Sequence, residues 1–305
     1  MQVTDSKKTV IIVCGPTAVG KTDVAIELAK YFNTEIISAD SRQCFKELNI
    51  GVARPSEEAL KKVVHHFIAS HSILEEMNAA IFEIYALNKV AKLFETKNQV
   101  VLVGGTGLYI KAFCEGLDTI PQIPISIREK INKDYFEKGM DWLQNEVMQK
   151  DSLFYKESEN KNPHRLLRAL EVVEATGKSI LTFRKNKKFE RDFEIIKIGL
   201  DLPKEILHQN IATRVDKMME VGQLDEVKSL LGFKNCNALQ TVGYSELVDF
   251  IENKISLTQS IEEIKKNTRR YAKRQLTWFR KDKEIFWFHP NQISDVLEFA
   301  AKNCN

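Results

Sequence analysis

The chain has 305 residues, of which 43% are hydrophobic and 29% charged, as is typical of a globular protein with a full core. The net charge of +3 does not by itself indicate nucleic-acid binding, and the five scattered cysteines fit a reducing compartment and give no zinc pattern. The N-terminus leaves no room for a signal peptide, and no apolar run is long enough to span a bilayer. We therefore expect a cytoplasmic protein without a membrane partner. We also expect a monomer.

A glycine-rich turn follows the first predicted strand. Residues 15–22 read GPTAVGKT directly after the apolar run 10–14, and a helix is predicted over 21–32. Strand, loop and helix in this order are the context of a phosphate-binding loop, in which backbone N–H groups converge on the anion. Lys21 adds a positive charge, and the Thr22 hydroxyl is a candidate ligand for Mg²⁺. The candidate phosphate-binding residues are Gly15, Pro16, Thr17, Ala18, Val19, Gly20, Lys21 and Thr22.

Strands and helices continue to alternate after this loop. Apolar runs predict strands over 35–39 and 99–103, with a helix over 82–96 between them. This alternation predicts an α/β fold, a P-loop NTPase-like parallel sheet core flanked by helices. The segments DSRQ (40–43) and GGTG (104–107) each follow a strand, so we expect both to meet the phosphate loop in one crevice at the carboxyl edge of the sheet.

The position of Asp40 is compatible with three roles. Asp40 could bind Mg²⁺ through a water molecule, act as a general base, or cap a helix. The glycines of 104–107 allow a ligand to approach the backbone closely, although a tight turn explains them as well. For His65 and His66 we expect a buried or capping role.

The sequence pattern changes after Gly116, where Pro121 and Pro124 mark a linker. Residues 126–191 read as helices rich in Lys and Arg, and strand character resumes at 193–200. We therefore expect a helical insertion domain over 119–192 in a core domain made of 1–118 and 193–305. The end of the core, from 203 onward, is predicted to be helical with a late strand at 285–288.

Two basic segments stand out. The segment 162–171 opens a helix and places Arg165 and Arg168 on one face, which suits either a phosphate grip or a solvated surface. Residues 265–283 interleave Lys and Arg with Tyr271, Trp278 and Phe279, a composition that suits stacking on a single-stranded RNA loop. An amphipathic helix with its aromatic residues in the core explains the second segment equally well, and we expect both features together.

Several segments stand in the order of one family and extend over nearly the whole chain. They are GPTAVGKT (15–22), SADSRQ (38–43), GGTGLY (104–109), NPHRLLRALEV (162–172), RVDKM (214–218), ALQTVGYSEL (238–247) and YAKRQLTWFR (271–280). In these segments the chain resembles the bacterial tRNA dimethylallyltransferases, also called tRNA isopentenyltransferases, of the IPP transferase family. It departs from them at His164, where a second Arg is often found.

The resemblance implies transfer of a dimethylallyl group from dimethylallyl diphosphate to the N6 amine of the adenosine 3′ of the tRNA anticodon. It implies Mg²⁺ as cofactor and the anticodon stem-loop as partner. The implied catalytic residues are Asp40 as base, with Lys21, Thr106 and Arg214. The residues implied to contact tRNA are Asp40, Ser41, Arg42, Gln43, Thr106, Arg128, His164, Arg165, Leu166, Leu167, Arg168, Arg269, Arg270, Lys273, Arg274, Gln275, Trp278 and Arg280.

Two other functions fit the phosphate loop. A kinase on the same fold would transfer a phosphoryl group from ATP to a small acceptor. An RNA-binding switch would bind a nucleotide without chemistry, and its biological activity would survive the loss of Asp40.

Overall fold

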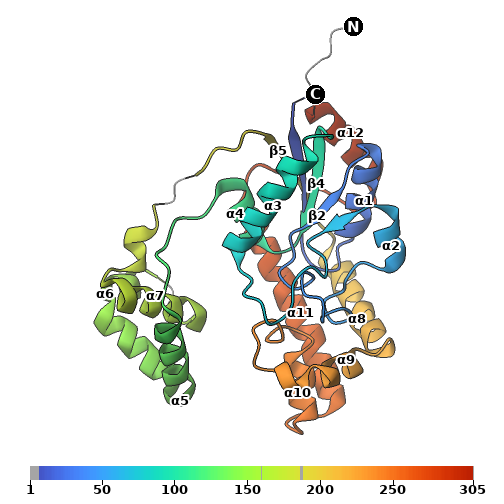
Figure 1. Ribbon diagram of the computed structural model, residues 1–305. Coiled ribbons are helices and arrows are strands. Elements are labelled where there is room, and N and C mark those ends of the chain that lie inside the picture. The colour runs from blue at the N-terminus through green and yellow to red at the C-terminus, as the bar shows by residue number, and fades with distance from the viewer. Residues whose placement is uncertain (1–6, 159, 186–187, 305) are drawn as a thin grey trace. The chain divides into compact units, whose positions relative to one another are not determined.

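A parallel sheet of six strands forms the centre of the computed structural model, which describes residues 7–158, 160–185 and 188–304 (Figure 1). All of its pairings are parallel, and the strand order is β3-β2-β4-β1-β5-β6. The predicted α/β fold with a parallel sheet flanked by helices is therefore confirmed. The strands are β1 (Thr9–Cys14), β2 (Ile36–Ser38), β3 (His65–His66), β4 (Gln99–Gly104), β5 (Glu194–Leu200) and β6 (Ile285–Phe288).

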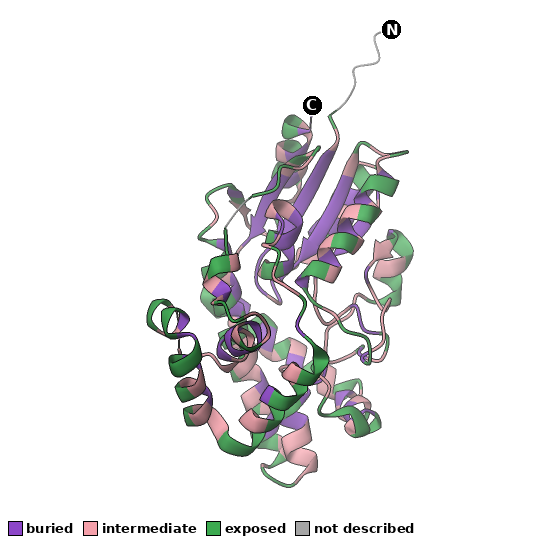
Figure 2. Ribbon diagram, turned by 60° about the vertical axis from the view of Figure 1, so that its left-hand side comes forward, coloured by how far each residue is buried: buried purple, intermediate pink, exposed green. Residues whose placement is uncertain are grey.

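Both faces of the sheet are covered, which explains the continuous apolar runs of its central strands. Side chains alternate between the two faces of a strand, so Ile11 and Val13 of β1 share one face. They belong to a core cluster with residues of α1 (Lys21–Tyr31) and α12 (Ile293–Asn303). Val10 and Ile12 point the other way and are also fully buried. Figure 2 shows the strands largely in the colour of buried residues.

Aromatic residues pack α3 (Ala79–Leu93) against α4 (Gly107–Glu115). Phe82 of α3 stacks on Tyr109 of α4 with ring centroids 4.6 Å apart, and Phe67 meets Phe82 edge-on at 5.1 Å. Phe67 comes directly after the edge strand β3, which consists of only two residues. The sequence predicted a buried or capping role for both histidines of that strand. They are instead half-buried edge residues, too few for a periodic pattern to reveal them as a strand.

The strand register brings the segments that follow β1, β2 and β4 to the same edge of the sheet. Cys14 at the end of β1 lies opposite Gly104 at the end of β4, and Ser38 at the end of β2 lies opposite Val103. The chain that leaves each strand therefore starts at the same level. This alignment follows from the pairing of parallel strands and fixes where the site is built.

The chain folds into two compact units. The core unit consists of Met1–Cys114 and Glu190–Asn305, and the helical unit of Glu115–Phe189. No helix within the described residues is long and apolar enough to cross a membrane. The remaining helices of the core unit are α2 (Glu57–Lys62), α8 (Lys204–Glu220), α9 (Gln223–Ser229), α10 (Ser245–Ile251) and α11 (Leu257–Phe279), with the short 3₁₀ turn Leu231–Phe233.

The helical unit has its own hydrophobic core. Its helices are α5 (Ile125–Lys150), α6 (Ser152–Glu157) and α7 (Pro163–Thr176), followed by the 3₁₀ turn Ile180–Phe183. Leu143 of α5, Phe154 of α6 and Leu166 of α7 are fully buried in one cluster. Helix α5 is interrupted at Gly139, whose φ of 77° few other residues adopt. Asn162 caps α7 by accepting a hydrogen bond from the N–H of Arg165.

Candidate active site

The loop between β1 and α1 has the backbone of an anion-binding turn. Gly15 adopts a φ of 146°, and a Cβ there would lie 2.6 Å from the carbonyl oxygen of Leu200. Gly20 adopts a φ of 97° immediately before α1, and no side chain of the described residues caps this helix. The first N–H groups of α1 therefore have neither an intrahelical nor a side-chain acceptor, and together with the helix dipole they favour an anion.

A cavity of about 150 Å³, which we call the phosphate-loop cavity, brings the predicted segments together. Thr17 to Thr22 of the loop, Asp40 and Gln43 of the turn after β2, and Gly104 and Gly105 after β4 all line it. The convergence predicted from the order of strands and turns is therefore observed. Arg214 of α8, Tyr271 and Gln275 of α11, and residues of the segments 52–55 and 65–68 also line it.

Gln275 joins the phosphate loop to the turn after β4. Its Oε1 accepts a hydrogen bond from the N–H of Thr17 at 2.8 Å, and its Nε2 donates one to the carbonyl of Gly105 at 2.8 Å. A Cβ on Gly105 would lie 2.2 Å from this Nε2, so the close approach requires glycine. The sequence predicted that Gln275 contacts tRNA. Gln275 is only 7% exposed, and its amide already makes these two hydrogen bonds. A contact with tRNA would therefore have to replace one of them.

Asp40 uses one carboxylate oxygen to hold its own turn. Oδ1 accepts hydrogen bonds from the N–H groups of Arg42 at 2.9 Å and Gln43 at 3.2 Å. Among the described residues no hydrogen bond reaches the second oxygen, Oδ2. Asp40 thus holds a turn and does not cap a helix, because residues 41–44 are not helical, and Oδ2 remains available for either of the other two roles.

Thr106 connects the turns after β2 and β4. Its Oγ1 accepts a hydrogen bond from the N–H of Ser41 at 3.1 Å, and it is also bonded to the hydroxyl of Tyr271. Burial of that hydroxyl raises the pKa of Tyr271 to about 12, so it stays protonated. Tyr271 was absent from the predicted site residues. The signal for it was its place among the cations of 265–283.

Two cations face the phosphate loop, and no salt bridge to either is found among the described residues, although the charges of Asp40 and Asp23 act on Lys21 and Arg214 respectively. Lys21 donates a hydrogen bond from Nζ to the carbonyl of Pro16 at 2.7 Å, and Arg214 donates one to Oγ1 of Thr17 at 3.3 Å. Burial, followed by the positive charge of Arg214, lowers the pKa of Lys21 to about 8. Burial also lowers the pKa of Arg214. An anion in this cavity would relieve both effects.

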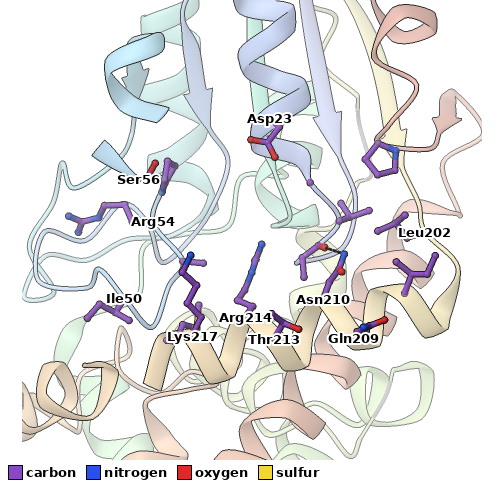
Figure 3. Close-up of a pocket in the computed structure, with 18 of the residues that line it drawn as sticks. Asp23, Ile50, Arg54, Ser56, Leu202, Gln209, Asn210, Thr213, Arg214 and Lys217 are labelled. Carbon is purple, nitrogen blue, oxygen red and sulfur yellow. Dashed lines mark hydrogen bonds between the residues drawn. The ribbon is translucent and has the colours of Figure 1, made fainter. Parts of the chain in front are cut away.

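Two further cavities adjoin the first. A side cavity of about 230 Å³ is lined by Asp40 to Arg42, by Gly51 to Ala53 and by Thr241 to Gly243. An open cavity of about 1450 Å³ shares Ala18, Val19 and Gly20 of the phosphate loop with the first cavity. Figure 3 shows Arg214 and Lys217 rising from α8 into this open cavity, with Ile50 and Arg54 on the facing loop.

Helix α11 presents its cations on the side away from the core. Ala272, Gln275 and Phe279 are buried, whereas the predicted tRNA contacts Arg270, Lys273, Arg274, Trp278 and Arg280 are exposed and Arg269 is half-buried. The guanidinium of Arg274 lies over the ring of Tyr271, 5.8 Å from its centroid. A Cβ on Gly107 would lie 2.3 Å from the indole of Trp278, so this indole packs against the start of α4. The helix is therefore amphipathic as expected, with Phe279 in the core and Tyr271 and Trp278 partly exposed, while its contact with RNA stays a prediction.

In the helical unit, the predicted tRNA contacts differ in accessibility. His164 and Arg165 are exposed and Leu167 is half-buried, whereas Leu166 is fully buried. The side chain of Leu166 therefore packs in the core of this unit, and any ligand would meet its exposed neighbours.

A buried carboxylate lies between the other two predicted cations of this unit. Glu171 is 7% exposed, and its oxygens lie 3.0 Å from Nη1 of Arg168 and 3.6 Å from Nε of Arg128. The carboxylate thus fixes both guanidinium groups at one place on the surface of α7 and α5.

Comparisons with a family model, with related sequences and with solved structures all point to the same family. The IPP transferase family model matches residues 43–282. The tRNA dimethylallyltransferase of Christiangramia forsetii is 49% identical over 296 residues, 97% of this chain and 98% of that protein. The one of Cytophaga hutchinsonii is 45% identical over 292 residues, 96% of each chain. A crystal structure of the full-length tRNA isopentenylpyrophosphate transferase from Bacillus halodurans matches with a TM-score of 0.73 and 32% identity, covering 98% of this chain and 97% of that one.

Proposed function

The chain belongs to the IPP transferase family and transfers a dimethylallyl group to tRNA, and we propose that the acceptor is N6 of the adenosine 3′ of the anticodon. The proposed donor is dimethylallyl diphosphate. One observation carries this proposal: the anion-binding loop and Asp40, whose Oδ2 accepts no hydrogen bond from the described residues, line the same small cavity. A group-transfer reaction needs a site for its leaving group and a base for its nucleophile, and the cavity offers both.

On the donor side, the uncapped N–H groups of the phosphate loop would bind the diphosphate. Lys21 and Arg214 add two positive charges in the same cavity. Negative charge develops on the diphosphate as the bond between C1 of the prenyl group and oxygen breaks. Fixed donors and charges that face this position stabilise the transition state more than the ground state.

The residues of the cavity also fit Mg²⁺. Within the described residues no three His, Cys, Asp or Glu side chains gather into a metal-binding group. The Thr22 hydroxyl and the Asp40 carboxylate nevertheless line the same cavity, and hard oxygen ligands completed by diphosphate and water are what Mg²⁺ prefers. We propose that Thr22 holds the ion, which would neutralise charge on the diphosphate when bound.

On the acceptor side, an adenine amine is a poor nucleophile because its lone pair is delocalised into the ring. We propose that Oδ2 of Asp40 accepts a proton from N6 while N6 forms its bond to C1 and the diphosphate departs with the electrons of the broken C–O bond. Thr106 and Ser41 would contact the base next to Asp40. The nucleotide must leave its stack to reach this cavity, as in other enzymes that act on bases.

We propose that the exposed cations of α11 and the arginines of α7 bind phosphates of the anticodon stem-loop. Aromatic rings among cations, as at Trp278, suit a loop with unstacked bases. We propose that the protein is active as a monomer. We place the reaction in the cytoplasm, where tRNA is decoded.

The test is mass spectrometry of tRNA nucleosides after incubation of the purified protein with dimethylallyl diphosphate or with ATP. We expect a dimethylallylated adenosine with the first donor and no reaction with the second. Phosphorylation of an acceptor by ATP without any prenylated adenosine would favour the kinase instead.

A further inference from the structure

One carboxylate joins two segments that wall the side cavity. Glu226 of α9 accepts hydrogen bonds from the backbone N–H groups of Asn49 at 3.1 Å, Ile50 at 2.7 Å and Gly51 at 3.1 Å. The same carboxylate accepts a hydrogen bond from the hydroxyl of Tyr244, which stands just before α10. Segments nearly two hundred residues apart in sequence thus meet at one side chain.

The segment 49–55 has an unusual position, because it contributes to all three cavities. Its residues line the phosphate-loop cavity, the side cavity and the open cavity. It has no helix or strand of its own, and Ala53 adopts a φ of 50°. A loop of this kind keeps its shape only when its surroundings fix it.

Two of the side chains that hold this loop act at different points. Gln43, three residues after Asp40 in the site, donates hydrogen bonds from Nε2 to the carbonyls of Val52 at 3.2 Å and Ala53 at 3.0 Å. Glu226 holds the preceding residues through their N–H groups. The loop is therefore tied to the turn of Asp40 at one end and to α9 at the other.

The facing wall of the side cavity is fixed by the same helix. Gln223 of α9 donates a hydrogen bond from Nε2 to the carbonyl of Gly243 at 3.0 Å, and Gly243 lies beside the fully buried Tyr244. A Cβ on Gly51 would lie 2.6 Å from the ring of Tyr244, so the two walls touch where Glu226 binds both. Hydrogen bonds to an ionised carboxylate are stronger than those between neutral groups.

We propose that Glu226 is a positioning residue that sets the width of the side cavity, and through it the fit of the tRNA acceptor beside Asp40. This inference rests on the proposed function. Glu226 lines none of the three cavities and touches no reacting atom, so it acts through the loop 49–51. Because Gly51 lines only the side cavity, the acceptor should be affected more than the donor.

The loop itself is tested by hydrogen–deuterium exchange of the free protein. Glu226→Ala removes one acceptor from each of three N–H groups, and we expect the amides of Asn49, Ile50 and Gly51 to exchange faster than in the wild type. The control is Asp225→Asn on the same helix, because Asp225 is exposed and, among the described residues, forms an ion pair with Lys228 alone. We expect wild-type exchange of the three amides in that variant.

The consequence for the reaction is tested by steady-state kinetics with tRNA and dimethylallyl diphosphate. For Glu226→Ala we expect the KM for tRNA to rise on the order of tenfold, as for lost hydrogen bonds to a charged group, with a smaller change in the donor KM and in kcat. Glu226→Gln keeps the shape and one acceptor oxygen, and we expect partial recovery. Gly51→Ala leaves Glu226 intact but pushes the loop off Tyr244, and we expect the same pattern as in Glu226→Ala.

Two results would overturn the proposal. One is wild-type exchange of the 49–51 amides in Glu226→Ala. The other is a fall in kcat with both KM values unchanged in Glu226→Ala and Glu226→Gln, which is the mark of a smaller folded fraction. A wild-type protein that transfers no dimethylallyl group would refute the proposed function, and the exchange experiment would still decide whether Glu226 holds the loop.

Discussion

The lowered pKa of Lys21 makes donor affinity depend on pH. Without ligand, burial and the charge of Arg214 bring this pKa to about 8. A bound diphosphate adds negative charge beside Nζ and raises the pKa. The complex therefore binds its proton more tightly than the free protein does, so affinity is greatest below pH 8 and falls as the pH rises through that value.

The size of the effect follows from the pKa. At pH 9.5 about one Lys21 side chain in thirty is protonated in the free protein, so the Kd for dimethylallyl diphosphate should rise by up to about thirtyfold relative to pH 7. The assay is isothermal titration calorimetry with the donor alone, without tRNA, from pH 6.5 to 9.5. A phosphate group has lost its last proton near pH 6, so the ligand itself adds little to this step.

Two variants separate Lys21 from other titrating groups. Lys21→Arg keeps its charge across this range, and we expect weaker binding with a flat profile above pH 7. Lys21→Ala should bind weakly at every pH without a step near pH 8. A flat wild-type profile, or the same step in Lys21→Ala, would refute the reasoning.

Three further predictions concern other parts of the site. Asp40→Asn keeps an oxygen that can accept the hydrogen bonds of Oδ1 but removes the base. The single-turnover rate should fall by a factor of about 10²–10⁴, while filter binding should show unchanged affinity for tRNA. A rate near that of the wild type would exclude the role as base. The double variant Arg270→Ala and Lys273→Ala should have a shallower slope of log K for tRNA against log salt concentration, by roughly 0.7–0.9 per lost phosphate contact. The control Lys302→Ala on α12 should keep the wild-type slope. Equal slopes in all three proteins would count against phosphate binding by α11. Gln275→Ala removes the hydrogen bonds to the N–H of Thr17 and the carbonyl of Gly105. The free energy of unfolding in urea should therefore fall by about 1–3 kcal/mol, and donor binding should weaken. An unchanged free energy of unfolding would show that these two bonds do not stabilise the loop.

Local patterns explain why much of this site could be predicted from sequence. The apolar run before GPTAVGKT predicts a strand that ends at an anion-binding loop, and both features depend on neighbouring residues only. The same holds for Asp40 and for Gly104, each of which closely follows a predicted strand. Parallel pairing then places all three at one edge of the sheet.

Contacts between distant segments could not be predicted in this way. Gln275 reaches Thr17 across 258 positions, and no periodicity or motif links the two. The pattern of cations around Gln275 indicated a surface for RNA, whereas its side chain faces inward because it lies on the same side of α11 as Ala272 and Phe279. In the sequence, Glu226 is one of several acids in a charged helix. Its role follows only from the hydrogen bonds that it accepts from the distant loop 49–51.

Substitutions on the exposed face of α11 test the proposed RNA binding better than a truncation does. Removing the chain from Lys265 onward would delete most of the inner face of α11 and strand β6, which pairs with β5 in the sheet. Such a truncation would remove core packing together with the exposed cations. Substitutions confined to the exposed face avoid this loss.

The central claim is that the phosphate loop holds a leaving group while Asp40 activates a tRNA adenosine in the same cavity. The most direct measurement counts diphosphate released from dimethylallyl diphosphate and maps the modified nucleotide in the same tRNA sample. We expect one diphosphate for each dimethylallyl group, and every group on N6 of the adenosine 3′ of the anticodon. Diphosphate release without tRNA modification, or a dimethylallyl group on another nucleotide, would contradict the account.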